Sequence, residues 1–237
     1  MNDSFRCRLV TWDEIAKWTE GLGAKIKRSD FDPDVIVGLT RGGWVAARLL
    51  CDLLGIKRLY AVKVEHWGIT AQPDGKARLI QGLATDISDR NVLLVDDITD
   101  TGESLELATR HVGNRDPRDL RSATVLHITH SKFEPDFYEI KVPAEEWAWF
   151  IFPWNLHEDL RTIITKTLDE TARTGAEIRE VLQSAFQLDL DSDLIEGTLR
   201  ELAEAGTATK KGGGYRLPSD GDTGESKTRE VRRKLRS

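Results

Sequence analysis

The chain has 237 residues, of which 39% are hydrophobic and 31% charged, and its formal net charge is −6 at pH 7. A chain of this length can bury a core of its own, and its hydrophobic content is ordinary for a globular protein. The negative charge excludes a general electrostatic attraction to nucleic acid. Because no apolar run approaches membrane-spanning length, we expect no membrane segment.

The cysteines and the start of the chain indicate a compartment. Cys7 and Cys51 have neither a metal-binding nor a redox spacing. The first residues, Met-Asn-Asp-Ser-Phe-Arg, lack the hydrophobic region of a secretory signal. We therefore expect a reduced, cytoplasmic protein.

The first core strand is expected over Asp34 to Leu39 and runs into the turn Gly38-Leu-Thr-Arg-Gly-Gly43, after which a helix continues until Gly55. A cationic side chain at Arg41, beside the bare backbone N–H groups of Gly42 and Gly43, suits a pyrophosphate. Alone, such a turn could equally be a tight strand–helix connection. It has neither the glycine pattern of dinucleotide-binding folds nor the lysine of a Walker loop.

The stretch Asn91 to Ser104 predicts a strand, an acidic turn and the start of a helix. Val92 to Val95 form an apolar run typical of a strand buried on both faces of a parallel sheet. Its carboxylates suit ribose hydroxyls and Mg²⁺, while the hydroxyl-rich loop and the free N–H groups of a helix start suit a phosphate. A phosphorylated sugar combines both. The alternative, a buried strand followed by an Asp N-cap, explains one acidic residue but not three at fixed spacing.

Further strands are expected around this centre. One spans Leu59 to Val64 and is followed by a long polar loop, 65–78, of a length that is usually functional or disordered. Ile80 to Leu83 then returns as a strand. Arg121 to Thr129 forms another, which brings His130-Ser-Lys132 to the end of the sheet. For His127 and His130 we expect structural roles, because neither has partners at metal-binding spacing.

An aromatic segment, Glu145 to Trp154, contains three tryptophans and two phenylalanines in ten residues. Aromatic rings suit a flat heterocycle, which they can stack upon. A packed aromatic edge is the alternative for Trp147 and Trp154, and we favour Trp149 as the stacking residue.

After this segment the composition changes. A helix capped by Thr174, a second helix from Ser192 to a stop at Gly206, and a hairpin around Gly212-Gly-Gly214 resemble a winged helix-turn-helix module over roughly 166–218. The second helix is acidic, which opposes DNA binding, because DNA affinity depends mostly on Lys and Arg. We favour a packing or oligomerisation role and expect the polar, finally basic tail to be disordered.

The stretch 91–104 closely resembles the 5-phosphoribosyl-1-pyrophosphate (PRPP) motif of type I phosphoribosyltransferases. The Thr-Arg-Gly-Gly turn is similar to the pyrophosphate loop of 6-oxopurine phosphoribosyltransferases, and the Trp-x-x-x-Pro-Trp run to the hood of the xanthine–guanine enzymes. The resemblance covers about 8–155. It implies an α/β fold with a mainly parallel sheet flanked by helices, and a hood. We therefore expect a phosphoribosyltransferase domain over 1–157, a small α+β winged-helix-like domain over 158–218 and a tail over 219–237.

The resemblance implies a Mg²⁺-dependent enzyme of purine salvage. Such an enzyme is expected to transfer the 5-phosphoribosyl group of PRPP to hypoxanthine, guanine or xanthine and to release pyrophosphate. Asp100 is implied as the general base, and Asp96 and Asp97 as ligands of the metal, directly or through water. The residues implied in PRPP binding are Arg41, Gly42, Gly43, Asp96, Asp97, Thr99, Asp100, Thr101, Gly102, Glu103 and Ser104. Those implied in base binding are Lys132, Trp149, Phe150 and Ile151.

Two alternatives stay open at this point. One is a transcriptional regulator that senses PRPP or a nucleotide and acts through the winged helix. The other is a phosphoribosyltransferase for a different acceptor, such as orotate or uracil. The family also implies a homo-oligomer, a dimer or tetramer, as the working form.

Overall fold

The computed structural model describes residues 4–66 and 77–219. The chain divides into two compact units. The sheet unit comprises the described residues 11–66 and 77–147, and the C-terminal unit comprises 4–10 and 148–219. Most of the polar loop 65–78 and almost all of the tail 219–237 lie outside the described residues. In the part of the chain that is described, no helix combines the length and apolar character that crossing a membrane requires.

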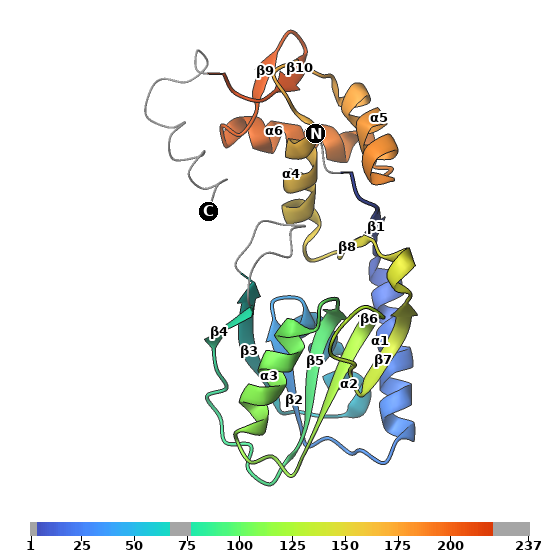
Figure 1. Cartoon of the computed structure of the whole chain (residues 1–237), viewed down its shortest axis with the longest axis vertical. Helices are drawn as coiled ribbons and strands as arrows, with labels where there is room; N and C mark the ends of the chain where they lie inside the picture. The colour runs from blue at the N-terminus through green and yellow to red at the C-terminus, as the bar shows by residue number, and fades with distance from the viewer. Residues whose placement is uncertain (1–3, 67–76, 220–237) are drawn as a thin grey trace. The chain divides into compact units, whose positions relative to one another are not determined.

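The sheet unit is built on six strands in the order β4-β3-β2-β5-β6-β7 (Figure 1). All neighbours pair in parallel except β3 and β4. The strands are β2 (Val35–Thr40), β3 (Leu59–His66), β4 (Ala77–Gln81), β5 (Asn91–Thr99), β6 (Asp119–Ile128) and β7 (Phe137–Val142). The helices are α1 (Trp12–Arg28), α2 (Gly43–Leu54), α3 (Glu103–Gly113) and the 3-10 turn η1 (Ala144–Glu146). The mainly parallel α/β sheet predicted from the sequence is confirmed.

The central strands are buried on both faces. Val92 to Val95 of β5 are fully buried, as the continuous apolar run predicts. On one face, apolar residues of β2 and β5 pack with Leu105, Ala108 and Val112 of α3. On the other face lies α2, which approaches so closely that a Cβ built on Gly38 would be 2.9 Å from the Cβ of Ala47. Helices on both faces leave the edge at the carboxyl ends of the strands for the connecting loops.

Helix α1 begins with a capping box at Thr11. The Thr11 hydroxyl accepts the backbone N–H of Glu14 at 3.2 Å, and the Glu14 carboxylate accepts the N–H of Thr11 at 2.9 Å. This reciprocal capping box satisfies two N–H groups that a helix start otherwise leaves without partners. This cap is the first residue of the sheet unit.

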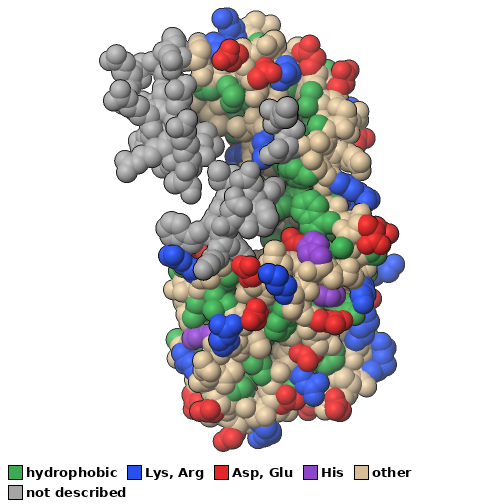
Figure 2. Space-filling view, viewed as in Figure 1, with side chains coloured by type: hydrophobic (Ala, Val, Ile, Leu, Met, Phe, Trp, Pro, Cys, Tyr) green, Lys and Arg blue, Asp and Glu red, His purple; other side chains and the backbone are tan. Residues whose placement is uncertain are grey.

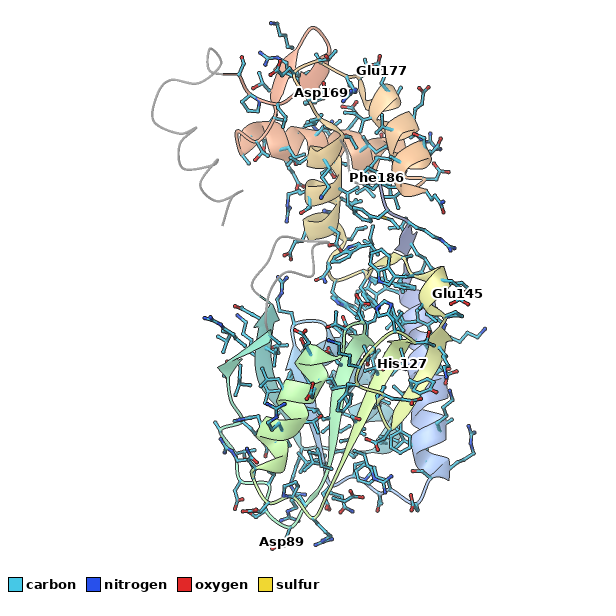
Figure 3. The ribbon with its side chains drawn as sticks, viewed as in Figure 1. Asp89, His127, Glu145, Asp169, Glu177 and Phe186 are labelled. Atoms are coloured by element: carbon cyan, nitrogen blue, oxygen red, sulfur yellow. The ribbon has the colours of Figure 1, made fainter. Side chains whose placement is uncertain are left out.

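The C-terminal unit contains two short sheets and three helices. Strand β1 (Cys7–Leu9) pairs in parallel with β8 (Trp149–Ile151), and β9 (Thr209–Lys211) pairs antiparallel with β10 (Gly214–Arg216). The helices are α4 (Leu156–Thr167), α5 (Gly175–Phe186) and α6 (Ser192–Glu204). Their apolar faces form one core, in which Phe186 (labelled in Figure 3) is fully buried. Of these elements the sequence analysis expected α5, α6 and the hairpin, and the winged-helix-like character stays a prediction.

The aromatic segment that resembles a hood contributes β8 to the C-terminal unit rather than to the sheet unit. Ile151 is fully buried in the core of α4, α5 and α6, and Trp149 packs against that core. The two compact units therefore divide at Trp147 and Ala148, whereas the sequence suggested a boundary at residue 157. The difference arises because the parallel pairing of β8 with β1 joins the aromatic segment to the start of the chain.

Candidate active site

Two loops meet at the carboxyl edge of the sheet. Strands β2 and β5 are parallel neighbours, with Gly38 opposite Val95. The turn that follows β2, Arg41 to Gly43, therefore lies against the last residues of β5, where Asp96 and Asp97 stand. Ligands of open α/β sheets bind outside this edge. The structure thus brings together the two motifs that the sequence singled out separately.

The contact between the loops is so close that only glycine fits. A Cβ built on Gly42 would lie 1.8 Å from Oδ2 of Asp97. One built on Gly43 would lie 2.6 Å from both the carbonyl oxygen of Val95 and the Cα of Asp96. The glycines allow the backbone of the turn to lie directly on the acidic pair.

The acidic pair is electrostatically unusual. The N–H of Asp97 donates to Oδ1 of Asp96 at 3.0 Å, the N–H of Ile98 donates to Oδ1 of Asp97 at 3.0 Å, and the N–H of Gly43 donates to the Asp96 carboxylate. Burial, and then the neighbouring charge of Asp97, raise the pKa of Asp96 well above its ordinary value. Two adjacent carboxylates with so little solvent favour a cation or hydroxyl donors as their ligands.

The loop from Thr101 to Ser104 has the features of an anion seat. Gly102 has φ = 87° and is the N-cap of α3 without a side-chain cap. A Cβ on Gly102 would lie 2.6 Å from the Ser131 hydroxyl, so glycine is required by both conformation and space. The first N–H groups of α3 face the loop as they do at any helix start, and such groups favour an anion.

Thr99 differs from the rest of the predicted phosphate loop. Its side chain is buried, and its hydroxyl donates to the hydroxyl of Thr124 on β6 at 3.1 Å. Its hydroxyl is thus used within the sheet, and the part of Thr99 in PRPP binding stays a prediction. The position of Thr99 in the sequence, just before the loop, does not show whether its hydroxyl lies inside the sheet or at its edge.

Asp100 lies between two ring nitrogens. Nε2 of His130 is 2.6 Å from its Oδ1, and the indole Nε1–H of Trp147 donates to the same oxygen at 3.3 Å. The sequence analysis missed both residues: it expected His130 to be structural and Trp147 to pack. The available signal for His130 was its place just after β6, the strand next to β5 in the sheet. His127 (labelled in Figure 3), in contrast, is buried on β6 against Tyr138, and its structural role stays a prediction.

The residues expected to bind the base are divided between the units. Lys132 is exposed in the sheet unit, where its backbone N–H donates to the carbonyl of Thr101 at 3.2 Å. Trp149, Phe150 and Ile151 form β8 in the C-terminal unit. Trp149 and Ile151 point to the helical core, whereas Phe150 lies on the opposite face, with the Arg8 guanidinium 5.7 Å from its ring centre. The environment of Trp149 is that of a packing residue.

The backbone of Phe150 is directed away from β1. The N–H of Trp149 donates to the carbonyl of Arg6 at 2.7 Å, and the N–H of Val10 donates to the carbonyl of Ile151 at 2.9 Å. In a parallel pair, alternate residues of a strand turn their backbone groups to the neighbouring strand. The backbone N–H and carbonyl of Phe150 therefore face the other edge of β8 and take no part in its pairing with β1.

Comparison with known proteins identifies the family. The model of the phosphoribosyl transferase domain matches residues 8–160. The match covers more than half of the chain, and the protein belongs to this family. The assignment agrees with the loops described above, because their residues are those by which the sequence resembles type I phosphoribosyltransferases.

Several relatives are named for purine substrates. Hypoxanthine-guanine phosphoribosyltransferase of Mycobacterium tuberculosis is 30% identical over 101 residues, which are 41% of this chain and 48% of that protein. Hypoxanthine phosphoribosyltransferase of Haemophilus influenzae is 27% identical over 150 residues, 61% of this chain and 80% of that protein. The chain thus spans about half the length of the mycobacterial relative. A crystal structure of purine phosphoribosyltransferase from Pyrococcus horikoshii has a TM-score of 0.54 at 27% identity, and covers 65% of this chain and 95% of that one.

Replacing the two loop glycines should separate backbone from side-chain crowding. Gly43→Ala places a methyl group against the backbone of β5, which cannot move without disturbing the sheet, and should lower the free energy of unfolding by about 1–3 kcal/mol. Gly42→Ala meets the end of the Asp97 side chain, which can rotate away, and should cost less. Urea denaturation of both variants measures the difference. A larger loss for Gly42→Ala would contradict this account of the contact.

The acidic pair predicts a pH-dependent stability. Because the folded protein holds the Asp96 proton to a higher pH than the unfolded chain, the contribution of Asp96 to stability is greatest near about pH 4 and is lost as the pH rises towards the folded pKa. Asp96→Asn removes this loss. Without divalent cations, its melting temperature should equal that of the wild type near about pH 4 and exceed it at about pH 7. The exposed Asp30→Asn is the control, and an equal difference at both pH values would refute the prediction.

Proposed function

We propose that the protein is a Mg²⁺-dependent phosphoribosyltransferase that transfers the 5-phosphoribosyl group of PRPP to a 6-oxopurine base. The observation that supports this best is the contact of the Gly42–Gly43 backbone with the Asp96–Asp97 pair. It joins a loop suited to pyrophosphate with carboxylates suited to a ribose, and PRPP carries both groups on adjacent atoms of one sugar. Membership of the family and the purine relatives favour the same reaction.

In this proposal each loop binds one part of PRPP. Arg41 and the N–H groups of Gly42 and Gly43 bind the pyrophosphate. Asp96 and Asp97 accept hydrogen bonds from the ribose hydroxyls. The 5′-phosphate lies at the start of α3, against the residues Thr101, Gly102, Glu103 and Ser104. Charge then matches throughout: cation and N–H donors face phosphates, and carboxylates face hydroxyls.

The acidic pair also fits Mg²⁺. Among residues 4–66 and 77–219 no three His, Cys, Asp or Glu side chains form a metal-binding group. A dedicated protein cage is therefore not the expected mode. Mg²⁺ commonly uses one or two carboxylates together with substrate phosphates and water, and Asp96 and Asp97 supply such a pair. When bound there, the ion would neutralise charge on the leaving pyrophosphate.

The main requirement of the reaction is to stabilise the negative charge that develops on the leaving pyrophosphate. A nitrogen of the base forms a bond to the anomeric carbon of the ribose while the bond from that carbon to pyrophosphate breaks, and the electron pair leaves with pyrophosphate. Arg41 and the glycine N–H groups stabilise that negative charge. Asp100 takes the proton from N7 of the base as the base becomes attached.

For the base we keep the contacts that the sequence predicts, each described within its own unit. Lys132 would contact the 6-oxo group, and the backbone groups near Phe150 and Ile151 would read the 2-position, where hypoxanthine, guanine and xanthine differ. Trp149 was predicted as the stacking residue. Since its side chain packs on the helical core and that of Phe150 does not, we now propose Phe150 as the ring that stacks on the base.

The C-terminal unit has the charges of a packing module. The four acidic residues Asp193, Glu196, Glu201 and Glu204 of α6 outnumber Arg200, and Glu201 forms an ion pair with Arg161 of α4 at 3.0 Å. On the face drawn in Figure 2, the described acidic and basic side chains are interspersed. These features favour the enzyme over a DNA-binding regulator. Action in cytoplasmic purine salvage and assembly into a dimer or tetramer stay predictions of the sequence.

The direct test is pyrophosphate release by the purified protein with PRPP and Mg²⁺. Hypoxanthine, guanine, xanthine, adenine, orotate and uracil are supplied in turn. We expect turnover with at least one of the 6-oxopurines and none with orotate or uracil. If no base gave pyrophosphate release although PRPP binding was measurable, the result would contradict the proposal and favour a sensor.

The matched variant for this assay is Asp100→Asn. It keeps the size of the side chain and removes its basicity, so kcat should fall by about 10²–10⁴, while the dissociation constant of PRPP changes by less than about threefold. Equal losses in both quantities would refute the role of Asp100 as the base.

Substitutions in β8 should separate stacking from packing. Phe150→Leu should raise the KM of the base by about tenfold, because a stacked ring contributes about 1–3 kcal/mol, and should leave the melting temperature close to that of the wild type. Trp149→Leu should lower the melting temperature, since it removes a ring packed on the core. The reverse pattern would restore Trp149 as the stacking residue. Both quantities are measured on the same preparations.

A further inference from the structure

One oxygen of Asp100 is the meeting point of two side chains. Oδ1 lies 2.6 Å from Nε2 of His130 and 3.3 Å from Nε1 of Trp147. Among the described residues no hydrogen bond or ion pair is made to Oδ2. The two oxygens of this carboxylate, which are chemically equivalent in solution, are therefore made different by their surroundings.

Both ring nitrogens act as donors. The indole N–H of Trp147 can only donate, and an ionised carboxylate can only accept. Nε2 of His130 must then carry a hydrogen to bond the same oxygen, whatever the state of its Nδ1. Two N–H donors on Oδ1 resist rotation of the carboxylate and leave Oδ2 as the oxygen that can accept a proton from a ligand.

The three side chains come from three adjacent parallel strands. Asp100 follows β5, His130 follows β6, and Trp147 follows β7 and η1. The last two connections are tied together, because the N–H of Thr129 donates to the carbonyl of Val142 at 2.9 Å and the Thr129 hydroxyl accepts the N–H of Ala144 at 2.9 Å. Hydrogen bonds between neighbouring loops thus hold both donors at the same edge of the sheet.

We infer that His130 and Trp147 are positioning residues of the active site, which fix Oδ1 of Asp100 so that Oδ2 faces the base. This inference rests on the proposed function, in which Asp100 takes the proton of the base. A carboxylate free to rotate would present its accepting oxygen in the right direction only part of the time, and misdirected geometry lowers the rate of proton transfer without weakening substrate binding.

A double-mutant cycle tests the inference. His130→Leu removes one donor and should lower kcat by about tenfold, the lower end for a hydrogen bond to a charged group, because both side chains are partly exposed. The KM of PRPP should change by less than about twofold. In the Asp100→Ala background the same substitution should change kcat by less than about twofold, because a positioning residue acts only through the group that it holds. An equal fall in both backgrounds would overturn the inference.

Conservative variants and matched controls complete the series. His130→Gln keeps an N–H donor on a side chain of similar reach and should restore most of the activity lost in His130→Leu. Trp147→Phe keeps a ring and removes the donor, and should lower kcat less than His130→Leu does, because its hydrogen bond is longer. His157→Leu and Trp12→Phe replace exposed residues elsewhere and should match the wild type. Failure of His130→Gln to recover activity would count against the inference.

A second measurement does not depend on turnover. The indole N–H signal of Trp147, assigned in an NMR spectrum by its loss in Trp147→Phe, should shift in Asp100→Ala, whereas the signal of Trp12 should not. An unchanged Trp147 signal would overturn the inference even in an active enzyme. Conversely, a wild type that is silent with every base would refute the proposed function, and a shifted Trp147 signal would then still establish the contact with Asp100.

Discussion

The candidate site depends on the contact between a bare backbone and an acidic pair, of which Asp97 is buried and Asp96 half-buried. Gly42 and Gly43 lie against Asp97 and Asp96 at distances that leave no room for a Cβ. Because the turn after β2 and the end of β5 share this contact, neither can move without the other. The environment also sets the electrostatics, because burial, and then the neighbouring charge of Asp97, raise the pKa of Asp96. The arrangement therefore suits a ligand that brings acceptors to the N–H groups and hydroxyls or a cation to the carboxylates.

The parallel sheet makes that contact possible. In a sheet with the order β4-β3-β2-β5-β6-β7, the connections after β2, β5, β6 and β7 all emerge at one edge. Arg41, Asp100, His130 and Trp147 are far apart in the sequence, and the adjacent strands bring their loops together. The hydroxyl of Thr129 and the backbone of Val142 then connect the last two loops. The strand order thus brings the loops to one edge, and local hydrogen bonds fix the positions of the last two loops relative to each other.

The aromatic strand β8 of the C-terminal unit has two different faces. Trp149 and Ile151 alternate with Phe150 along β8, so the strand packs on the helices with one face and presents a ring and backbone groups with the other. A strand of three residues is too short to be stable alone, and its pairing with β1 ties it to the beginning of the chain. The start of the chain is therefore part of the unit formed by its last third, which no local sequence pattern reveals.

The sequence by itself determined the features that depend on local chemistry. The apolar run Val92 to Val95, the acidic residues that follow it, the Thr-Arg-Gly-Gly turn and the Thr11 cap were all predictable, because strand burial, turn conformation and capping depend on neighbouring residues. Only the tertiary structure decided which side chains meet. It placed His130 and Trp147 on Asp100, enclosed the Thr99 hydroxyl against Thr124, and turned Trp149 inwards and Phe150 outwards. These outcomes depend on strand order, register and packing between residues distant in the chain, and the spacing of residues along the sequence does not contain that information.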